Sequence, residues 1–486
     1  MTVELIAAEP LSLGAIGDAL GPRLRLGAEV RTSTERVFYD TFDGLLHEAG
    51  LTHWAAPDTP PRRTLSEPAR EAIGVRALLP VAHVRVRSST APLLDSLQKT
   101  VAKVSIERPT LPQASRAQRR LRPRIVLEPV RGYDSEVEHA RRLLRAKLEC
   151  SDAEQSLREE AAIGLGTDPA GASSSVDVAL TPTQRADEAA AAVLTRLQEV
   201  IEQNLPGTLA DIDSEFLHDY RVALRKARTV LRELSGVFPR ERLAALRGEL
   251  KWLQAITGDR RDLDVYVLDF EELRALVPAE QQPELEPVKR VLSHRRGSAH
   301  KQMLKDLESR RARTAMKSWT TMLDYLPRLS DDDRPDAART IDDVSSERIR
   351  FVYRRMLKMG SAITPASAPD AYHELRKQGK ELRYLLELFG QPLHDPRVVK
   401  PMVKALKDLQ DVLGRHQDRD IQAKMLRGLA DEVKAQTGGA QALMATGVLV
   451  QRLDDDAAAA RAEFAQSFQA FSSREQREHV KEAFSG

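Results

Sequence analysis

Residues 218–228 read HDYRVALRKAR, and this stretch decides the fold of the chain. Read as a helix that continues to residue 232, it places cationic side chains three or four residues apart on one stripe. The stripe consists of His218, Arg221, Arg225, Arg228 and Arg232, with Lys226 beside it. Like charges at this spacing repel each other, so a helix does not stack them without a partner. The natural partner is a polyanion.

A second stretch repeats this pattern. Residues 373–383 read HELRKQGKELR, which puts His373, Arg376, Lys380 and Arg383 on a stripe with Lys377 beside it. His373 follows His218 by 155 positions (373 − 218 = 155), and LKWLQ at 250–254 returns as LKDLQ at 406–410. Two copies of one pattern predict two helical halves of about 150 residues, related by a pseudo-twofold axis.

The composition indicates a globular chain and favours helix. The 486 residues are 42% hydrophobic but only 5% aromatic. Lys+Arg 74 nearly balance Asp+Glu 72, whereas a nonspecific nucleic-acid binder carries a larger positive surplus. Cys150 is the only cysteine, which excludes an intramolecular disulfide and a cysteine-based zinc site. Because no apolar run is long enough for a membrane helix and no signal-peptide pattern is present, we expect a cytoplasmic protein without a membrane partner.

The chain divides into regions of different pattern. Residues 1–150 contain four short β-like segments, several of which alternate polar and apolar side chains, and this predicts a small α+β domain with an antiparallel sheet. The segments are residues 37–39, 83–87, 101–106 and 124–128. A linker is expected at 151–180, followed by a mainly α domain at 181–480 with halves at 181–335 and 336–480. Thr181 and Gln184 fit a capping box at its first helix, and residues 205–207 fit a turn.

The chemistry of the two stripes favours phosphate as the partner. Guanidinium groups bind phosphate oxygens in a planar, bidentate way and stay charged at every relevant pH. The alternative is a solvated face that acids on neighbouring helices neutralise. Two features favour the polyanion: a separate apolar stripe of Leu217, Leu224 and Leu231 lies beside the cations, and the arrangement recurs in the second half. We assign no catalytic or metal-ligating residue, and we expect Asp262, Asp264, Asp418 and Asp420 to cap helices or orient the arginines.

These segments resemble the CHAD family, the conserved histidine α-helical domain. The matching segments, in order, are HDYRVALRKAR, LKWLQAITGDRRDLDV, HELRKQGKELRYLLELF and LKDLQDVLGRHQDRDI. The resemblance implies two four-helix bundles that face each other around a basic cleft. It also implies polyphosphate binding and, in some members, association with polyphosphate granules. The contacts that it implies fall on His218, Arg221, Arg225, Arg228, Arg232, His373, Arg376, Lys377, Lys380 and Arg383, to which we add the flanking Lys226.

Residues 1–150 resemble a degenerate CYTH domain, the triphosphate tunnel fold. RVFYDTFD at 36–43 is similar to that family's YYDT element, and RGYD at 131–134 is similar to a late element. The hallmark Glu-x-Glu-x-Lys is absent, since residues 3–9 read VELIAAE. Triphosphate hydrolysis with Mg²⁺ or Mn²⁺ needs clustered carboxylates, so we expect a non-catalytic domain that needs no cofactor. The remaining candidates for such a site are Arg85, Arg87, Lys103, Glu107 and Glu128.

We therefore predict a cytoplasmic polyphosphate-binding protein, with polyphosphate granules as a further place of association. Two alternatives stay open. One is a metal-dependent triphosphatase in which the helical domain tethers the substrate, and the other is a nucleic-acid or protein interaction module. Aromatic residues for base stacking do not interleave with the basic stripes, which counts against nucleic acid.

Overall fold

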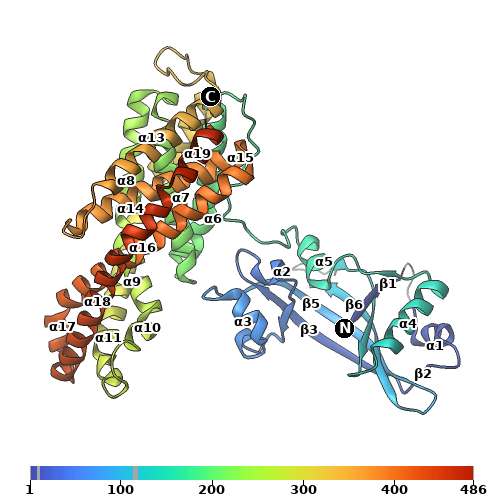
Figure 1. The fold of residues 1–486 in the computed structure, drawn as a ribbon. Coiled ribbons are helices and arrows are strands. Elements are labelled where there is room, and N and C mark those ends of the chain that lie inside the picture. The colour runs from blue at the N-terminus through green and yellow to red at the C-terminus, as the bar shows by residue number, and fades with distance from the viewer. Residues whose placement is uncertain (1, 8–10, 113–118, 485–486) are drawn as a thin grey trace. The chain divides into compact units, whose positions relative to one another are not determined.

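The computed structural model describes residues 2–7, 11–112 and 119–484, which form two compact units (Figure 1). The division falls between Ser174 and Ser175. The first unit is built around an antiparallel sheet, and the second consists of helices.

The sheet of the first unit has the strand order β4-β3-β5-β6-β8-β1-β9, and neighbouring strands are antiparallel. The strands are β1 (Val3–Ile6), β3 (Val30–Asp40), β4 (His53–Ala55), β5 (Leu79–Leu94), β6 (Thr100–Leu111), β8 (Arg124–Pro129) and β9 (Ser151–Asp152). The four predicted segments lie within β3, β5, β6 and β8, so the predicted antiparallel sheet is confirmed.

The two faces of this sheet differ because side chains alternate along each strand. On one face, Leu5, Ile106 and Ile125 belong to an apolar core with helices α1 (Leu13–Leu20) and α4 (Asp134–Lys147). The opposite face, named the charged face, carries Glu4, Lys103, Glu107, Arg124 and Glu128.

The first unit extends beyond the predicted domain boundary. The expected linker, 151–180, contains β9, which pairs with β1, and helix α5 (Leu157–Gly164). Ser156 and Glu159 form a capping box that starts α5, and Leu157 packs into an apolar cluster on the sheet. Residues 165–184 form neither helix nor strand, so the connection to the second unit is shorter than predicted.

The second unit is the predicted duplicated helical domain. The first repeat contains α6 (Ala186–Leu209), α7 (Ser214–Glu233), α8 (Arg240–Ile256), α9 (Gly258–Leu268), α10 (Phe270–Arg274), α11 (Glu286–Leu307) and α12 (Arg310–Tyr325). The second contains α13 (Ile341–Ser361), α14 (Pro369–Leu385), α15 (Gln391–Leu393), α16 (Pro396–Gly428), α17 (Ala430–Lys434), α18 (Gly439–Phe471) and α19 (Arg474–Phe484). The long α16 corresponds to α8 and α9 together, because the chain breaks its helix at Thr257 in the first repeat only.

The two bundles share one apolar core. Leu224 and Leu250 of the first repeat belong to the same cluster as Leu375 and Leu406 of the second. A separate cluster joins α9, α10 and α11 to α17 and the parts of α16 and α18 beside it. Figure 1 shows these helices gathered at one end of the helical unit. Each repeat therefore contributes to both clusters.

Backbone hydrogen bonds join the starts of the two repeats. The Ala186 amide donates to the Arg339 carbonyl at 2.9 Å, and the Ile341 amide donates to the Gln184 carbonyl at 2.8 Å. Donors and acceptors both differ by the repeat offset (341 − 186 = 155 and 339 − 184 = 155), so each bond is the image of the other. The pseudo-twofold axis therefore passes through this contact.

Two local predictions about α6 are wrong. The helix begins at Ala186 instead of at a capping box of Thr181 and Gln184, because the Gln184 carbonyl is bound to the second repeat. The helix also continues to Leu209 through Pro206, where a turn was predicted. Proline near a helix end removes few hydrogen bonds, so the bundle packing prevails there.

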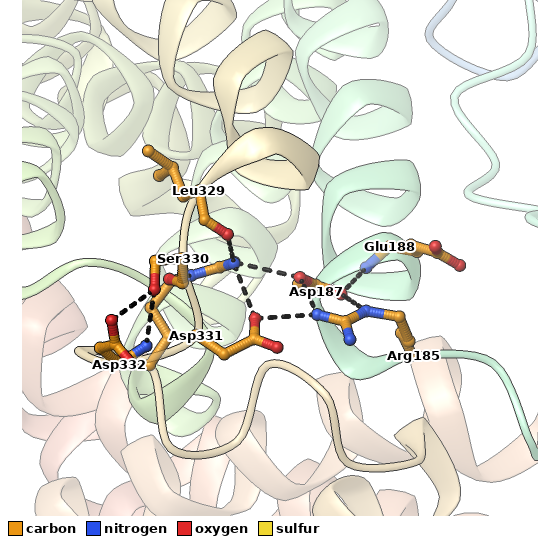
Figure 2. A network of polar contacts seen from close by, with 8 residues as sticks. Arg185, Asp187, Glu188, Leu329, Ser330, Asp331 and Asp332 are labelled. Carbon is orange, nitrogen blue, oxygen red and sulfur yellow. Dashed lines mark hydrogen bonds and ion pairs between the residues drawn. The ribbon is translucent and has the colours of Figure 1, made fainter.

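A buried ion pair connects the loop between the repeats to α6 (Figure 2). Arg334 and Asp187 are 1% and 2% exposed, and the Arg334 Nη1 lies 3.0 Å from the Asp187 Oδ2. The other partners of the Arg334 guanidinium are Leu329, Ser330 and Asp331. A buried charge is tolerated when its hydrogen-bonding groups are bound in this way.

Candidate anion-binding site

Helices α7 and α14 carry the two cationic stripes and pack against each other. The Asp213 side chain caps the start of α7 by accepting a hydrogen bond from the Glu215 amide at 2.9 Å. The predicted apolar stripe of Leu217, Leu224 and Leu231 is buried. Burying this stripe fixes the rotation of α7 about its axis and therefore the direction of its cations.

Two ion pairs cross from α7 to the chain of α14. The Lys226 Nζ lies 3.0 Å from the Glu387 Oε2, just after α14, and the Arg232 Nη2 lies 2.7 Å from the Glu381 Oε1. As the residue number rises on α7, the partner's number falls on α14. The two helices are therefore antiparallel where their stripes meet.

A cavity of about 510 Å³ lies between α7, α8 and α14. This cationic cavity is lined by Arg225, Arg228 and Arg232 of α7, by Arg247 and Lys251 of α8, and by His373, Arg376, Lys377 and Lys380 of α14. Glu381 is the only carboxylate among the described lining residues. An open volume with walls so rich in positive charge attracts anions that carry several charges.

Most of the predicted contact residues meet in this cavity. Those that line it are Arg225, Arg228, Arg232, His373, Arg376, Lys377 and Lys380. The others, His218, Arg221, Lys226 and Arg383, do not. The first repeat thus contributes the C-terminal part of its stripe and the second contributes the N-terminal part, as the antiparallel crossing requires.

The four remaining residues have other environments. Lys226 is bound to Glu387, and Arg383 lies 3.2 Å from the same carboxylate. Arg221 donates to the Gln254 carbonyl at 2.8 Å and to the Thr257 hydroxyl at 2.7 Å. His218 is half-buried near the start of α7. Lys226, Arg221 and Arg383 therefore bind other residues of the helical unit instead of lining the cavity.

Equivalent glycines lie beside the equivalent arginines of the two repeats. Gly258 is next to the Arg221 guanidinium, and Gly414 is next to that of Arg376. A glycine leaves room for the guanidinium to lie across the neighbouring helix. Whereas Arg221 is bound to backbone and hydroxyl oxygens, Arg376 lines the cavity and lies 3.0 Å from Asp418.

Two cations of α8 were missed from the sequence. Arg247 and Lys251 line the cavity, although they were not predicted as contacts. They stand four residues apart, so a helix places them on one face. Lys251 also belongs to the repeated LKWLQ segment. Their four-residue spacing was the sequence signal that could have identified them. The sequence alone does not show that this face of α8 points into the cavity, because that depends on how α8 packs against α7.

Burial and the crowding of positive charges lower the pKa values of two residues in the cavity. Burial lowers the pKa of Lys380 to about 7, and the nearby charges of Arg376 and Arg225 act in the same direction. Burial, with help from Arg232 and Arg247, also lowers the pKa of Arg228. An anion in the cavity would oppose both effects, because it favours the charged forms.

The aspartates of the repeated segments differ in their partners. Asp264 is buried and pairs with Arg260 and Arg296. Asp420 lies 2.7 Å from Lys424, and Asp262 is exposed. Of this group, Asp418 is the one that pairs with a cavity arginine.

The charged face of the first unit does not fit a divalent metal ion. Its carboxylates are held by cations of the chain: Glu4 and Glu160 by Arg124, Glu107 by Arg36, and Glu128 by Lys103. The Arg124 guanidinium is fully buried and lies 2.7 Å from each of its two partners. Carboxylates bound in this way are not free to ligate Mg²⁺ or Mn²⁺.

The five candidates named for a triphosphate site are divided between the two faces. Lys103, Glu107 and Glu128 lie on the charged face, whereas Arg85 and Arg87 point to the opposite face. Arg85 pairs there with Glu35 at 2.7 Å. These residues cannot surround one triphosphate.

Two searches of the described ranges gave negative results. Within residues 2–7, 11–112 and 119–484, no three His, Cys, Asp or Glu side chains are grouped to hold a metal ion. Among the helices in the same ranges, none combines the length and apolar character needed to cross a membrane.

Comparison with known proteins identifies the helical unit. Residues 191–427 match the CHAD domain family. The crystal structure of the CHAD domain from the plant Ricinus communis is similar, with a TM-score of 0.50 and 23% identity over 62% of this chain and 96% of that one. PptA from Streptomyces chartreusis matches with a TM-score of 0.47 and 19% identity, over 59% of this chain and 100% of that one. No curated protein matches the chain. The antiparallel sheet of the first unit is consistent with a CYTH-like fold.

Proposed function

Because this chain contains a CHAD domain, we propose that its helical unit binds inorganic polyphosphate in the cationic cavity. The observation that carries the proposal is the composition of the cavity wall, where basic side chains from three helices face a single described carboxylate. Linear polyphosphate is a chain of tetrahedral groups with closely spaced negative charges. It can therefore contact all three helices at once.

The cavity residues divide into two kinds of phosphate ligand. Arg225, Arg228 and Arg232 stand three and four residues apart on α7, and each can bind two phosphate oxygens through its planar guanidinium. Lys251 and Lys380 add compact positive charges from the two neighbouring helices. A ligand held by many such contacts should bind more weakly as salt increases, because it displaces counterions.

Charge reversal inside the cavity tests the proposal. The variant Arg225→Glu/Arg376→Glu/Lys380→Glu should bind polyphosphate of defined length at least about 100-fold more weakly, since each charge-assisted contact contributes about 1.5–3 kcal/mol. Isothermal titration of the full chain gives the affinity, and circular dichroism checks that helix content is kept.

A matched control reverses three exposed cations outside the cavity. Lys301, Lys305 and Lys317 lie on α11 and α12, so Lys301→Glu/Lys305→Glu/Lys317→Glu changes the net charge by the same amount. This control should keep its affinity within about threefold, since surface charges act weakly at physiological salt. Equal losses in both variants would contradict a localised site.

The residues of the first unit support triphosphate hydrolysis less well than those of the helical unit support polyphosphate binding. The carboxylates of the charged face are bound to Arg124, Arg36 and Lys103, so they are not free to hold a metal ion. We therefore expect no phosphate release from tripolyphosphate with Mg²⁺ or Mn²⁺. Metal-dependent release by the full chain, abolished by Glu4→Gln, would favour the triphosphatase alternative instead.

Competition tests the nucleic-acid alternative. At matched salt, polyphosphate should displace single-stranded and duplex nucleic acid from the chain, because Tyr384 is the only aromatic among the described cavity residues. Fluorescence imaging of the wild type and the cavity variant in cells would test association with polyphosphate granules. The wild type should gather on the granules and the variant should not.

A further inference from the structure

A second group of cations lies in a groove between α13 and α19. The groove has a volume of about 430 Å³ and is lined by Arg350 and Arg354 of α13 and by Arg477 and Lys481 of α19. Tyr353, Leu357 and Val480 are its other lining residues. Each helix therefore presents two cations spaced by four residues, an arrangement in which the like charges repel each other.

The two arginines that α13 contributes to this groove have no acidic partner at hydrogen-bond or ion-pair distance among the described residues. No carboxylate is among its lining residues, and Arg350 and Arg354 make no hydrogen bond or ion pair in the described ranges. Two acids within one turn of these cations are bound to other arginines: Glu347 to Arg339 and Glu478 to Arg474. The Arg477 Nε donates to the Ser472 carbonyl at 3.0 Å, which orients this guanidinium.

The groove is separate from the cationic cavity. Arg348 of α13 pairs with Glu233 at 2.7 Å, and Glu233 also binds the cavity residue Arg232. Positions 348 and 350 differ by about 200° around a helix, so Arg350 points away from the cavity. Helix α13 thus lies between the two sites.

The basic character of the groove is not a by-product of the repeat. Arg350 and Arg354 correspond to Thr195 and Glu199 in α6, at the offset of 155 (350 − 195 = 155 and 354 − 199 = 155). The first repeat therefore has a neutral and an acidic residue where the second has two arginines.

We propose that the groove between α13 and α19 is a second phosphate-chain site, so that one helical unit holds two segments of polyphosphate. Three guanidinium groups suit phosphate oxygens, and the one aromatic lining residue, Tyr353, is buried and cannot stack with a base. The choice of phosphate as the ligand rests on the function proposed for the cavity. The existence of an anion site rests on the groove alone.

Titration with tripolyphosphate, which is too short to occupy both sites together, tests the proposal on the full chain. The wild type should bind two molecules, and Arg354→Glu/Arg477→Glu should bind one. A matched control, Lys358→Glu/Arg474→Glu, reverses two exposed cations of the same helices outside the groove and should keep two. A stoichiometry of one in the wild type, or of two in the groove variant, would overturn the inference.

The cavity variant separates this inference from the proposed function. Arg225→Glu/Arg376→Glu/Lys380→Glu should keep one tripolyphosphate, bound in the groove. Complete loss in that variant would remove the groove as an independent site and leave the cavity proposal standing. Full retention of both sites would remove the cavity instead. Displacement of groove-bound tripolyphosphate by an equal concentration of polyglutamate would show that the groove does not select phosphate.

Discussion

Arg221 and Arg376 hold equivalent positions in the two repeats, and both lie beside a glycine of the neighbouring helix. Arg376 faces the cationic cavity, while Arg221 donates to the Gln254 carbonyl and the Thr257 hydroxyl. The residue equivalent to Thr257 is Leu413 (413 − 257 = 156), which offers no hydroxyl. The difference between Thr257 and Leu413 therefore explains why Arg221 has a structural role, whereas Arg376 is available to a ligand.

The same divergence appears at two other pairs of positions. Arg225 corresponds to Lys380, so a permanent cation of the first repeat faces a titratable one of the second. Asp187, buried against Arg334, corresponds to Asp342, which is partly exposed and lies 3.2 Å from His394. The duplication produced equivalent positions, and differences in residue type or in packing gave them different roles.

The largest expected effect concerns the two aspartates. Asp187→Ala should lower the free energy of unfolding by about 3 kcal/mol, because it removes the buried carboxylate of Arg334 and leaves only the exposed Asp331. The equivalent Asp342→Ala should cost at most about 1 kcal/mol, since its partner is a histidine at a partly exposed site. Urea titration measures both values. Equal losses would break the comparison, and recovery of stability in Asp187→Leu/Arg334→Met would sharpen it.

Arginine removal should have opposite consequences in the two repeats. Arg376→Gln should weaken polyphosphate binding about tenfold or more with little loss of stability. Arg221→Gln should leave the affinity nearly unchanged but cost about 1–3 kcal/mol, because it strands the oxygens that Arg221 binds. Calorimetric titration and thermal unfolding of both variants provide the measurements. A larger affinity loss for Arg221→Gln would place the ligand at the other end of α7.

Because Lys380 stands where the first repeat has Arg225, we predict that polyphosphate affinity depends on pH. The pKa of Lys380 is lowered to about 7, so its ammonium loses its proton as the pH rises through 7, while bound phosphate favours the charged form. Affinity should therefore be greatest below pH 7 and fall above it, by up to about tenfold per pH unit. Lys380→Arg should bind with a flatter profile between pH 6 and 9. If His373→Gln flattens the profile and Lys380→Arg does not, the histidine is the responsible group.

The smallest effect is expected for Thr257, the residue that distinguishes the surroundings of Arg221 from those of Arg376. Thr257→Val removes one acceptor of Arg221 and keeps the side-chain shape, so it should cost about 1 kcal/mol of stability. Polyphosphate affinity should not decrease. A gain in affinity would show that Arg221 becomes available when its hydroxyl partner is lost, which would make the two repeats more alike.

Sequence periodicity predicted much of the fold because burial alone determines those features. The strands around Val84, Val104 and Ile125 follow from alternating apolar positions, and the helical second unit follows from apolar positions at helical spacing. The repeat follows from the two copies of one motif. Packing between elements that are distant in sequence could not be predicted from these patterns. The linker prediction missed α5, which is stabilised by the sheet, and the helix start at Ala186 depends on a partner at Arg339.

The candidate site shows the same limit. Spacing put Arg225, Arg376 and Lys380 on the helix faces that line the cavity, since one helix period suffices for that. The antiparallel crossing of α7 and α14 then decides which end of each stripe lines the cavity. That crossing leaves His218 outside the cavity, and the packing of α8 against α7 adds Arg247 to its wall. Neither result can be predicted from a single helix.

The paired hydrogen bonds between the starts of α6 and α13 have a consequence for the origin of the chain. The Ala186 amide donates to Arg339, two residues before the first helix of the second repeat. The Ile341 amide donates to Gln184, two residues before the first helix of the first repeat. Contacts in which each residue meets the image of its partner define an isologous interface, the kind that closes a symmetric dimer. A single repeat would present the same donors and acceptors to a second copy of itself. The covalent fusion therefore preserves the geometry of a homodimer, while freeing each half to change separately, as Thr257 and Leu413 have done.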